Sequence, residues 1–148
     1  TIPAGVKHWH GAAEDSWFSH VAVECPGEGT STEWCEAAGE TSFSLGAPLR
    51  RQPSIQPTPA RTTRRFSERV PHRLNAFYYL KPLTDPKETV YMANVTFEPG
   101  CRNNWHIHQA AKGGGQILLC TGGRGWYQAW GQEARELLPG DVVTIPAG

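Results

Sequence analysis

The sequence predicts an all-β protein, an antiparallel sandwich or barrel built from short strands. Glycine and proline are frequent, with 16 and 12 of the 148 residues, and strong helical periodicity is hard to find. Short runs of β-branched and aromatic residues instead alternate with turn signals such as Pro-Gly and Gly-Gly. Several short strands at close spacing, separated by such turns, are typical of antiparallel sandwiches and barrels.

The expected strands follow in chain order. Near the start, KHWHG at 7–11 and WFSHVAVE at 17–24 have the composition of strands. The remaining expected strands are FYYLKPL (77–83), TVYMANVTF (89–97), NWHIH (104–108), GQILLCT (115–121), GWYQAW (125–130) and DVVTIP (141–146). A chain of this length is large enough to bury one core of its own, so we expect a single domain.

The stretch from 37 to 72 breaks this pattern and is expected to be a connector. It is rich in proline and arginine, and its hydrophobic residues are sparse and without a pattern. Such a composition is typical of extended, partly disordered linkers. The basic run could dock nucleic acid or an acidic partner, but a solvated connector is the preferred interpretation. The barrel is therefore expected to consist of about 1–36 and 73–148.

Bulk composition argues against several classes of protein. The formal net charge is zero, which favours neither nucleic acid nor a membrane surface as a partner. No apolar run approaches the length of a membrane span, and Thr1 to His10 do not resemble a signal peptide. The four cysteines are expected to be free thiols, although Cys25 and Cys35 could bridge a short loop. We therefore expect a cytoplasmic protein that acts on a small molecule.

The histidines are grouped in a way that suggests a metal site. Most of them lie in three groups, which are His8 with His10, His20 alone, and His106 with His108. In an H-x-H pair on a strand both imidazoles project from the same face, because side chains alternate with period two. If that face looks into a barrel, two pairs from different strands can converge on one cation, for which imidazole is a common ligand. A single histidine is more often structural, but two such pairs favour a metal.

The second histidine pair belongs to a longer motif. Gly100 is followed by CRNNW, then by His106-Ile-His108, and after a glycine-rich loop by Gln116. This stretch resembles the first motif of the cupin superfamily, which runs G-x5-H-x-H, then Glu or Gln, then Gly. The resemblance covers about 1–36 and 73–148, and it implies the cupin double-stranded β-helix, a jelly-roll barrel.

The second cupin motif, G-x5-P-x-G-x2-H, is divided between the two ends of the chain. Its front half is GDVVTIPAG at 140–148 and its back half is PAGVKH at 3–8, so that TIPAG occurs twice. A cupin that is circularly permuted inside this motif would contain that overlap, and permutation at a surface turn is well tolerated. Because two copies of one strand sequence compete for one place in a sheet, we also expect a homodimer, with strand exchange as one form of it.

The resemblance further implies a set of metal ligands, which are His106, His108, Gln116 and His8. The gap after His108 is longer than in the standard motif, so Gln109 competes with Gln116 for the amide position. Gln116 is preferred because it opens the apolar strand ILLC, where the family's ligand lies. Imidazole and amide-oxygen ligands suit Mn(II) or Fe(II), with Ni(II) and Zn(II) as alternatives.

Within the superfamily, the blocks VTFEPG, GRGWY, PGDVV and KHWHG resemble small single-domain cupins. These include proteins associated with carboxymuconolactone decarboxylases and bacterial manganese-dependent hydroxynitrile lyases. The resemblance implies a metal-dependent lyase in which the cation is a Lewis acid. His10 and His20 are candidate acid/base residues, although both could be structural. An Fe- or Mn-dependent dioxygenase with the same ligands and a non-catalytic cupin that binds metal or a small ligand stay open.

Overall fold

The structure is a computed structural model that describes residues 5–38, 68–71 and 77–147. Within these ranges it contains no helix, and its regular elements are thirteen β-strands. They are β1 (His8–Ala12), β2 (Phe18–Glu24), β3 (Gly27–Glu28), β4 (Ser31–Trp34), β5 (Glu68–Pro71), β6 (Phe77–Pro82), β7 (Met92–Phe97), β8 (His106–Gln109), β9 (Lys112–Gly113), β10 (Gln116–Gly123), β11 (Gly125–Ala129), β12 (Arg135–Leu137) and β13 (Val142–Ile145).

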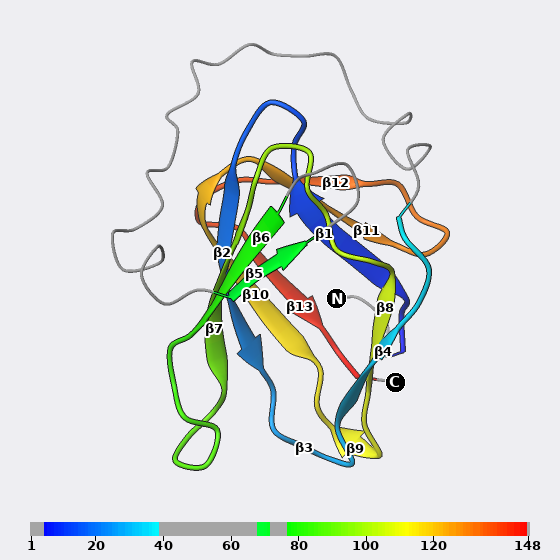
Figure 1. Cartoon of the computed structure of the whole chain (residues 1–148). Helices are drawn as coiled ribbons and strands as arrows, with labels where there is room; N and C mark the ends of the chain where they lie inside the picture. Colours follow the sequence, from blue (N-terminus) through cyan, green and yellow to red (C-terminus); the bar gives the residue numbers. More distant parts are fainter. Residues whose placement is uncertain (1–4, 39–67, 72–76, 148) are drawn as a thin grey trace.

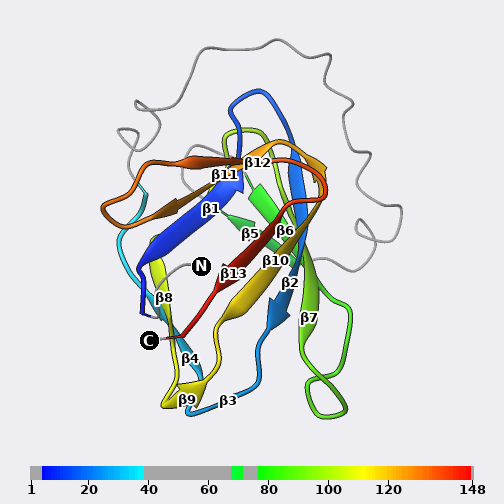
Figure 2. The ribbon, with the colours of Figure 1, turned by 180° about the vertical axis from the view of Figure 1, so that it is seen from behind.

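The strands form two large antiparallel sheets and one small one (Figure 1). The first sheet has the order β12-β11-β1-β8-β4 and the second has the order β13-β10-β2-β7-β6-β5. The short strands β3 and β9 pair with each other at one end of the molecule (Figure 2). The prediction of an all-β, antiparallel protein is therefore confirmed.

The core lies on the inner faces of the two large sheets. Alternation along β10 buries Leu118 and Cys120 and exposes Leu119, as expected for a strand with one buried face. Phe18, Phe97 and Leu118 are almost fully buried in this core, and burial of each such side chain contributes roughly 1.5–3 kcal/mol. Five histidines are buried in the same interior: His8, His10, His20, His106 and His108.

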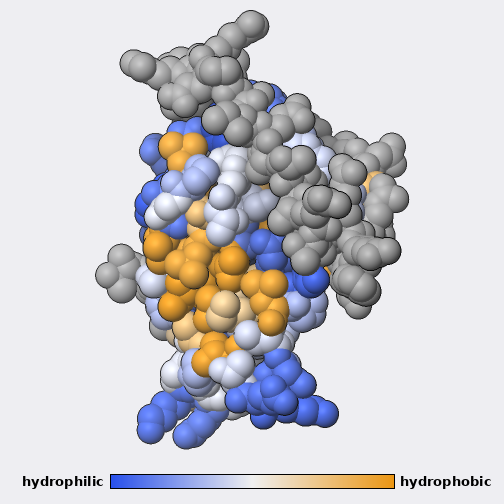
Figure 3. Space-filling model, turned by 90° about the vertical axis from the view of Figure 1, so that its left-hand side faces the viewer, coloured by the Kyte–Doolittle hydropathy of each residue, from blue (hydrophilic) through white to orange (hydrophobic). Residues whose placement is uncertain are grey.

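The outer face of the second sheet is unusually apolar. Leu119 of β10 is opposite Val142 of β13 and Val21 of β2 in the strand register. Leu119 remains 38% exposed and Val142 remains 52% exposed. Figure 3 shows hydrophobic side chains gathered on this side of the molecule. The alternation of β10 and β13 therefore places aliphatic side chains on both faces of this sheet.

The expected strands agree with those observed, with small shifts at their ends. The stretch predicted at 17–24 corresponds to β2, and that at 115–121 corresponds to β10, which continues to Gly123. The stretch predicted at 89–97 is longer than β7, which begins at Met92 because the chain before it forms a turn. The strands that the sequence did not indicate are β3, β4, β5, β9 and β12.

Two of the missed strands lack the sequence pattern by which strands are recognised, each for its own reason. β4 (STEW) has every residue exposed and therefore shows no alternation of apolar and polar side chains. β5 lies inside the stretch predicted as a connector, and it ends in a proline, which is tolerated at the edge of a sheet. Residues 39–67, most of that connector, lie outside the described residues, so the division into barrel and connector stays a prediction.

The repeated TIPAG is described mainly in its second copy. Thr144 and Ile145 of that copy belong to β13 and pair with β10. Of the first copy the structure describes only Gly5, so the strand exchange and the homodimer stay predictions. All four cysteines are free thiols, as expected. Among the described residues no helix is long and apolar enough to span a membrane.

Candidate metal centre

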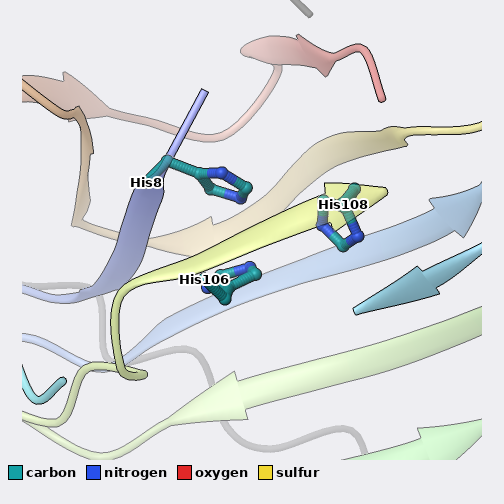
Figure 4. A group of neighbouring side chains, drawn as sticks. All are labelled: His8, His106 and His108. Atoms are coloured by element: carbon teal, nitrogen blue, oxygen red, sulfur yellow. The ribbon is translucent and has the colours of Figure 1, made fainter. Parts of the chain in front are cut away.

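Three imidazoles from two strands meet in the interior of the sandwich. His8 of β1 is the direct cross-strand partner of His106 of β8, and their ring centroids are 4.1 Å apart. His108, two residues further along β8, has its ring centroid 5.3 Å from that of His8. One potential ligand nitrogen from each ring lies within 4.8 Å of those of the other two. Figure 4 shows His8 extending from β1 and the other two side chains extending from β8.

Hydrogen bonds orient these rings and select their tautomers. Nδ1 of His8 lies 2.9 Å from the Val6 carbonyl oxygen, and Nδ1 of His106 lies 2.9 Å from that of Asn104. Because a carbonyl can only accept, both Nδ1 atoms carry the proton and donate it, which leaves each Nε2 with a free lone pair. Nδ1 of His108 contacts the Thr32 hydroxyl at 3.4 Å. Nε2 of His8 and Nε2 of His108 are buried and have no hydrogen-bond partner.

Burial keeps all three rings neutral. It lowers the pKa of His8 to about 4, against a smaller upward effect of the Val6 carbonyl. It lowers the pKa of His106 to about 3, and a charge on His8 would lower it further. Burial also lowers the pKa of His108, while Glu24 and Gln116 act in the opposite direction. The rings therefore present lone pairs rather than protons at neutral pH, as metal binding requires.

The two candidate glutamines lie in different environments. Gln116, the first residue of β10, is buried and lines the same cavity as His106 and His108. Its side chain acts to raise the pKa of His108, and its Oε1 is buried without a hydrogen-bond partner of ordinary geometry. Gln109 lies on the opposite face of β8 from the imidazoles and donates a hydrogen bond to Glu33 at 3.0 Å. Of the two glutamines, Gln116 is therefore the one that shares this cavity with His106 and His108.

The glycine before Gln116 allows β10 to begin close to β13. Gly115 has a φ of 92°, in the left-handed region that side chains rarely adopt. A Cβ at this position would lie 2.2 Å from the carbonyl oxygen of Ile145. Only glycine therefore fits where the chain before β10 lies against the end of β13. This close approach directly precedes Gln116 and so sets where the Gln116 side chain enters the interior.

A cavity of about 140 Å³ adjoins the three-histidine cluster. The polar residues that line it are His10, His20, Glu24, Thr32, Asn103, His106, His108 and Gln116. The rest of its wall is mainly apolar and aromatic, and is formed by Ala22, Trp34, Tyr78, Leu80, Tyr91, Ala93, Val95 and Phe97. A small organic molecule with both a polar group and an apolar part would match this lining.

His10 lies in the wall of this cavity, held by Asn103. The backbone N–H of His10 donates to Oδ1 of Asn103 at 2.9 Å, which turns the Asn103 NH₂ group towards the ring. Nδ2 of Asn103 is 3.1 Å from Nε2 of His10 and must donate to it. His10 therefore carries its proton on Nδ1, which is buried without a partner. Burial lowers the pKa of His10 well below its ordinary value.

His20 is the most isolated of the predicted site residues. It is fully buried, packs parallel to Phe97 at a centroid distance of 5.8 Å, and lies 4.9 Å from the ring of His10. Neither of its ring nitrogens has a hydrogen-bond partner. Burial lowers its pKa to about 3. A buried imidazole with two free nitrogens that lines a cavity is a candidate contact for a bound molecule.

Three residues of the site were missed by reasoning from the sequence. Glu24 shares a face of β2 with His20, because it lies four residues further along the same strand, and this period-two signal could have found it. Trp34 stacks at 4.8 Å from His106 while remaining 58% exposed, and β4 carried no recognisable pattern. Asn103 lies in a loop, where no local signal indicates its contact with His10.

The donor set fits a divalent transition metal. The imidazoles are neutral, two of their Nε2 atoms are buried without partners, and Gln116, whose amide oxygen is also buried without a partner, lines the cavity with His106 and His108. Nitrogen donors with a carbonyl-type oxygen suit Mn, Fe, Ni or Zn better than Ca or Mg, which prefer oxygen alone. The fold and the site together define an antiparallel β-sandwich with a histidine-rich candidate metal centre.

Comparison with known proteins adds one partial relative. The chain is 48% identical over 56 residues to a protein named (R)-mandelonitrile lyase from Granulicella tundricola. The match covers 38% of this chain and 40% of that protein, so the chain spans about two fifths of the length of the relative. No protein-family model matches the chain. No solved structure matches it either.

Proposed function

We propose that the chain is a circularly permuted cupin that binds a divalent cation and acts as a hydroxynitrile lyase. The observation that carries this proposal is the meeting of His8 with His106 and His108, which the permuted order of the motifs requires. The partial identity to (R)-mandelonitrile lyase supports the choice of reaction. The proposal names Mn(II) or Fe(II) as the ion, with Gln116 as the fourth ligand beside the imidazoles.

Permutation is supported by where the halves of the second cupin motif lie. β13 carries the front half and β1 carries the histidine of the back half. The end of β13 and the start of β1 lie on the same side of the molecule in both ribbon views (Figures 1 and 2). A single chain could therefore run from β13 into β1 at this side, as the unpermuted order demands.

A bound divalent cation would supply Lewis acidity, which favours deprotonation of a hydroxyl group near it. The protein's own contribution is to hold the substrate in the cavity with that hydroxyl beside His106 and His108. The aromatic and aliphatic wall then receives the rest of the molecule. An apolar cavity of about 150 Å³ can hold a benzene ring. The cavity here has a volume of about 140 Å³, which is enough for the phenyl group of mandelonitrile.

Cleavage of a cyanohydrin requires one proton to move. The hydroxyl loses its proton, the C–O bond becomes a carbonyl, and the C–CN bond breaks so that its electron pair leaves with cyanide. His20 can accept the proton, because it is neutral and both of its nitrogens are free of other partners. His10 can donate a hydrogen bond from its Nδ1–H to the departing cyanide, because Asn103 fixes the proton on that atom, and protonated His20 then gives the hydroxyl's proton to cyanide to form HCN. The ring centroids are 4.9 Å apart and both rings line the cavity, so both can contact one bound molecule.

The proposal is tested by metal content and by release of benzaldehyde from (R)-mandelonitrile. Wild-type protein loaded with Mn(II) or Fe(II) should retain the ion and release aldehyde, and His106→Ala should lose both. Gln109→Ala is the matched control for Gln116→Ala, because only Gln116 lies in the cavity. Aldehyde release that persists in His106→Ala would refute a metal-centred reaction. Oxygen uptake with catechols or diketones would indicate a dioxygenase, and tight metal binding without turnover would indicate a binding protein.

A further inference from the structure

Glu24 makes a direct contact with the proposed amide ligand. The two residues are opposite each other where β2 pairs with β10, and Nε2 of Gln116 donates to Oε1 of Glu24 at 2.6 Å. This is a short hydrogen bond to a charged acceptor, a class roughly twice as strong as bonds between neutral groups. Among the side chains of the described residues, Gln116 is the one that donates a hydrogen bond to Glu24.

The chemistry of the carboxylate determines which way the amide faces. A glutamine side chain can exchange the positions of its oxygen and nitrogen by rotation, and the two orientations have the same shape. An ionised carboxylate only accepts hydrogen bonds, so the NH₂ group must face Glu24 and the oxygen must face the other way. That oxygen is buried without a hydrogen-bond partner, and Gln116 lines the same cavity as His106 and His108. Removal of Glu24 would allow the NH₂ group, which cannot bind a cation, to face the imidazoles.

Glu24 also supplies the one negative charge at the centre. Among the described residues that line the cavity, Glu24 is the only carboxylate, and the three imidazoles and the amide are neutral. A dication held by neutral ligands alone keeps its whole charge inside a mostly apolar interior, where charge is costly. A carboxylate one hydrogen bond away lowers that cost without occupying a position on the ion.

We propose that Glu24 is a positioning residue of the metal centre, which turns the oxygen of Gln116 towards the cation and offsets part of its charge. This inference rests on the proposed function, because it takes Gln116 as a ligand of the ion. It adds a residue that neither the cupin motif nor the comparison indicates. The orienting role and the charge role make different predictions, so they can be separated by two substitutions.

The experiment measures Mn²⁺ affinity by the EPR signal of the free ion, in variants of the full chain. Glu24→Leu removes both the acceptor and the charge and is expected to weaken binding by about 10- to 100-fold. Glu24→Gln removes the charge but can still accept from Gln116 through its amide oxygen, so it should weaken binding less. In a Gln116→Leu background there is no amide for Glu24 to orient. In that background, Glu24→Leu should lower the Mn²⁺ affinity by no more than Glu24→Gln does.

A second readout reports the number of ligands. In the Co²⁺-loaded protein, Glu24→Leu and Gln116→Leu should change the visible d–d spectrum in the same way, because both remove the amide oxygen from the ion. Glu24→Gln should keep the wild-type spectrum. Thermal unfolding of the metal-free proteins shows whether each variant folds, and Glu24→Gln, which is nearly isosteric, tests the inference even if Glu24→Leu does not fold.

The outcomes separate this inference from the proposed function. One outcome would overturn the inference alone. In it, wild type binds Mn²⁺, His106→Ala does not, and neither Glu24 substitution changes the Mn²⁺ affinity. Equal losses from Glu24→Leu with and without Gln116 would also overturn it, because the effect would then not act through the amide. A wild-type protein that binds no Mn²⁺ or Co²⁺ would overturn the proposed function and this inference together.

Discussion

His8 and His106 are direct partners across β1 and β8, with ring centroids 4.1 Å apart, although they come from distant parts of the sequence. Each ring donates its Nδ1 proton to a carbonyl two residues before it in its own chain segment. The backbone therefore orients both rings before any ion binds. Such preorganisation reduces the conformational entropy that binding would otherwise cost.

The first prediction follows from this pair. His8→Ala is expected to lower the affinity for Mn²⁺ at least about 100-fold, more than the loss of a residue that only orients a ligand. His106→Ala should have a similar effect, because both rings present Nε2 to the same space. Titration of the metal-free proteins with Mn²⁺ measures this. If His8→Ala binds as tightly as wild type, His8 is not a ligand.

The second prediction concerns stability in acid. The pKa of His20 is about 3 in the folded protein and about 6.5 in the unfolded chain. Between these values the unfolded chain binds more protons, so the free energy of unfolding rises with pH and is lost as the pH falls from about 6.5 towards 3. His20→Phe, a substitution suited to the neighbouring Phe18 and Phe97, should reduce this slope by up to about 1.4 kcal/mol per pH unit.

Urea unfolding of both metal-free proteins at several pH values checks this slope. Groups that do not interact with His20 contribute equally to wild type and variant, so their effects cancel in the difference between the two curves. His10 does not cancel fully, because a charge on His20 also lowers its pKa. Parallel curves for wild type and His20→Phe would contradict the assignment of a lowered pKa to His20.

The third prediction concerns Trp34 at the edge of the cavity. Trp34→Ala should raise KM for an aromatic substrate by about 2- to 10-fold, the value of one aromatic contact, and leave Mn²⁺ affinity unchanged. Trp130→Ala is a matched control, because Trp130 is also 58% exposed but packs on Trp105 rather than on the cavity. Steady-state kinetics of both variants provide the test, and equal effects on KM would exclude a substrate contact specific to Trp34.

The fourth prediction tests the permutation. A rearranged chain in which 68–148 is followed directly by 6–38 contains TIPAG once and keeps every described strand. Because permutation at surface positions is well tolerated, it should fold and bind Mn²⁺ within about threefold of wild type. Circular dichroism and Mn²⁺ titration measure both properties. An unfolded product, with the unrearranged chain folded under the same conditions, would argue against a cupin order of strands.

The sequence alone predicted the class of fold and most of the strands, because alternation of apolar and polar residues is a local signal. It also placed His8 with His10, and His106 with His108, on common strand faces, since that follows from the period of a strand. That the two pairs could meet followed from strand faces that look into a barrel, and the order of the cupin motifs singled out His8 as the partner of His106 and His108. The strands β4 and β5 could not be predicted, because one is wholly exposed and the other lies in a proline- and arginine-rich stretch.

Only the tertiary structure decided which neighbours each buried group has. That Glu24 accepts from Gln116, that Asn103 fixes the tautomer of His10, and that Trp34 lies on His106 all depend on which strands pair. Pairing between strands is set by packing over the whole chain and not by any window of sequence. Local periodicity therefore determined which face each histidine occupies, and long-range packing determined what that face meets.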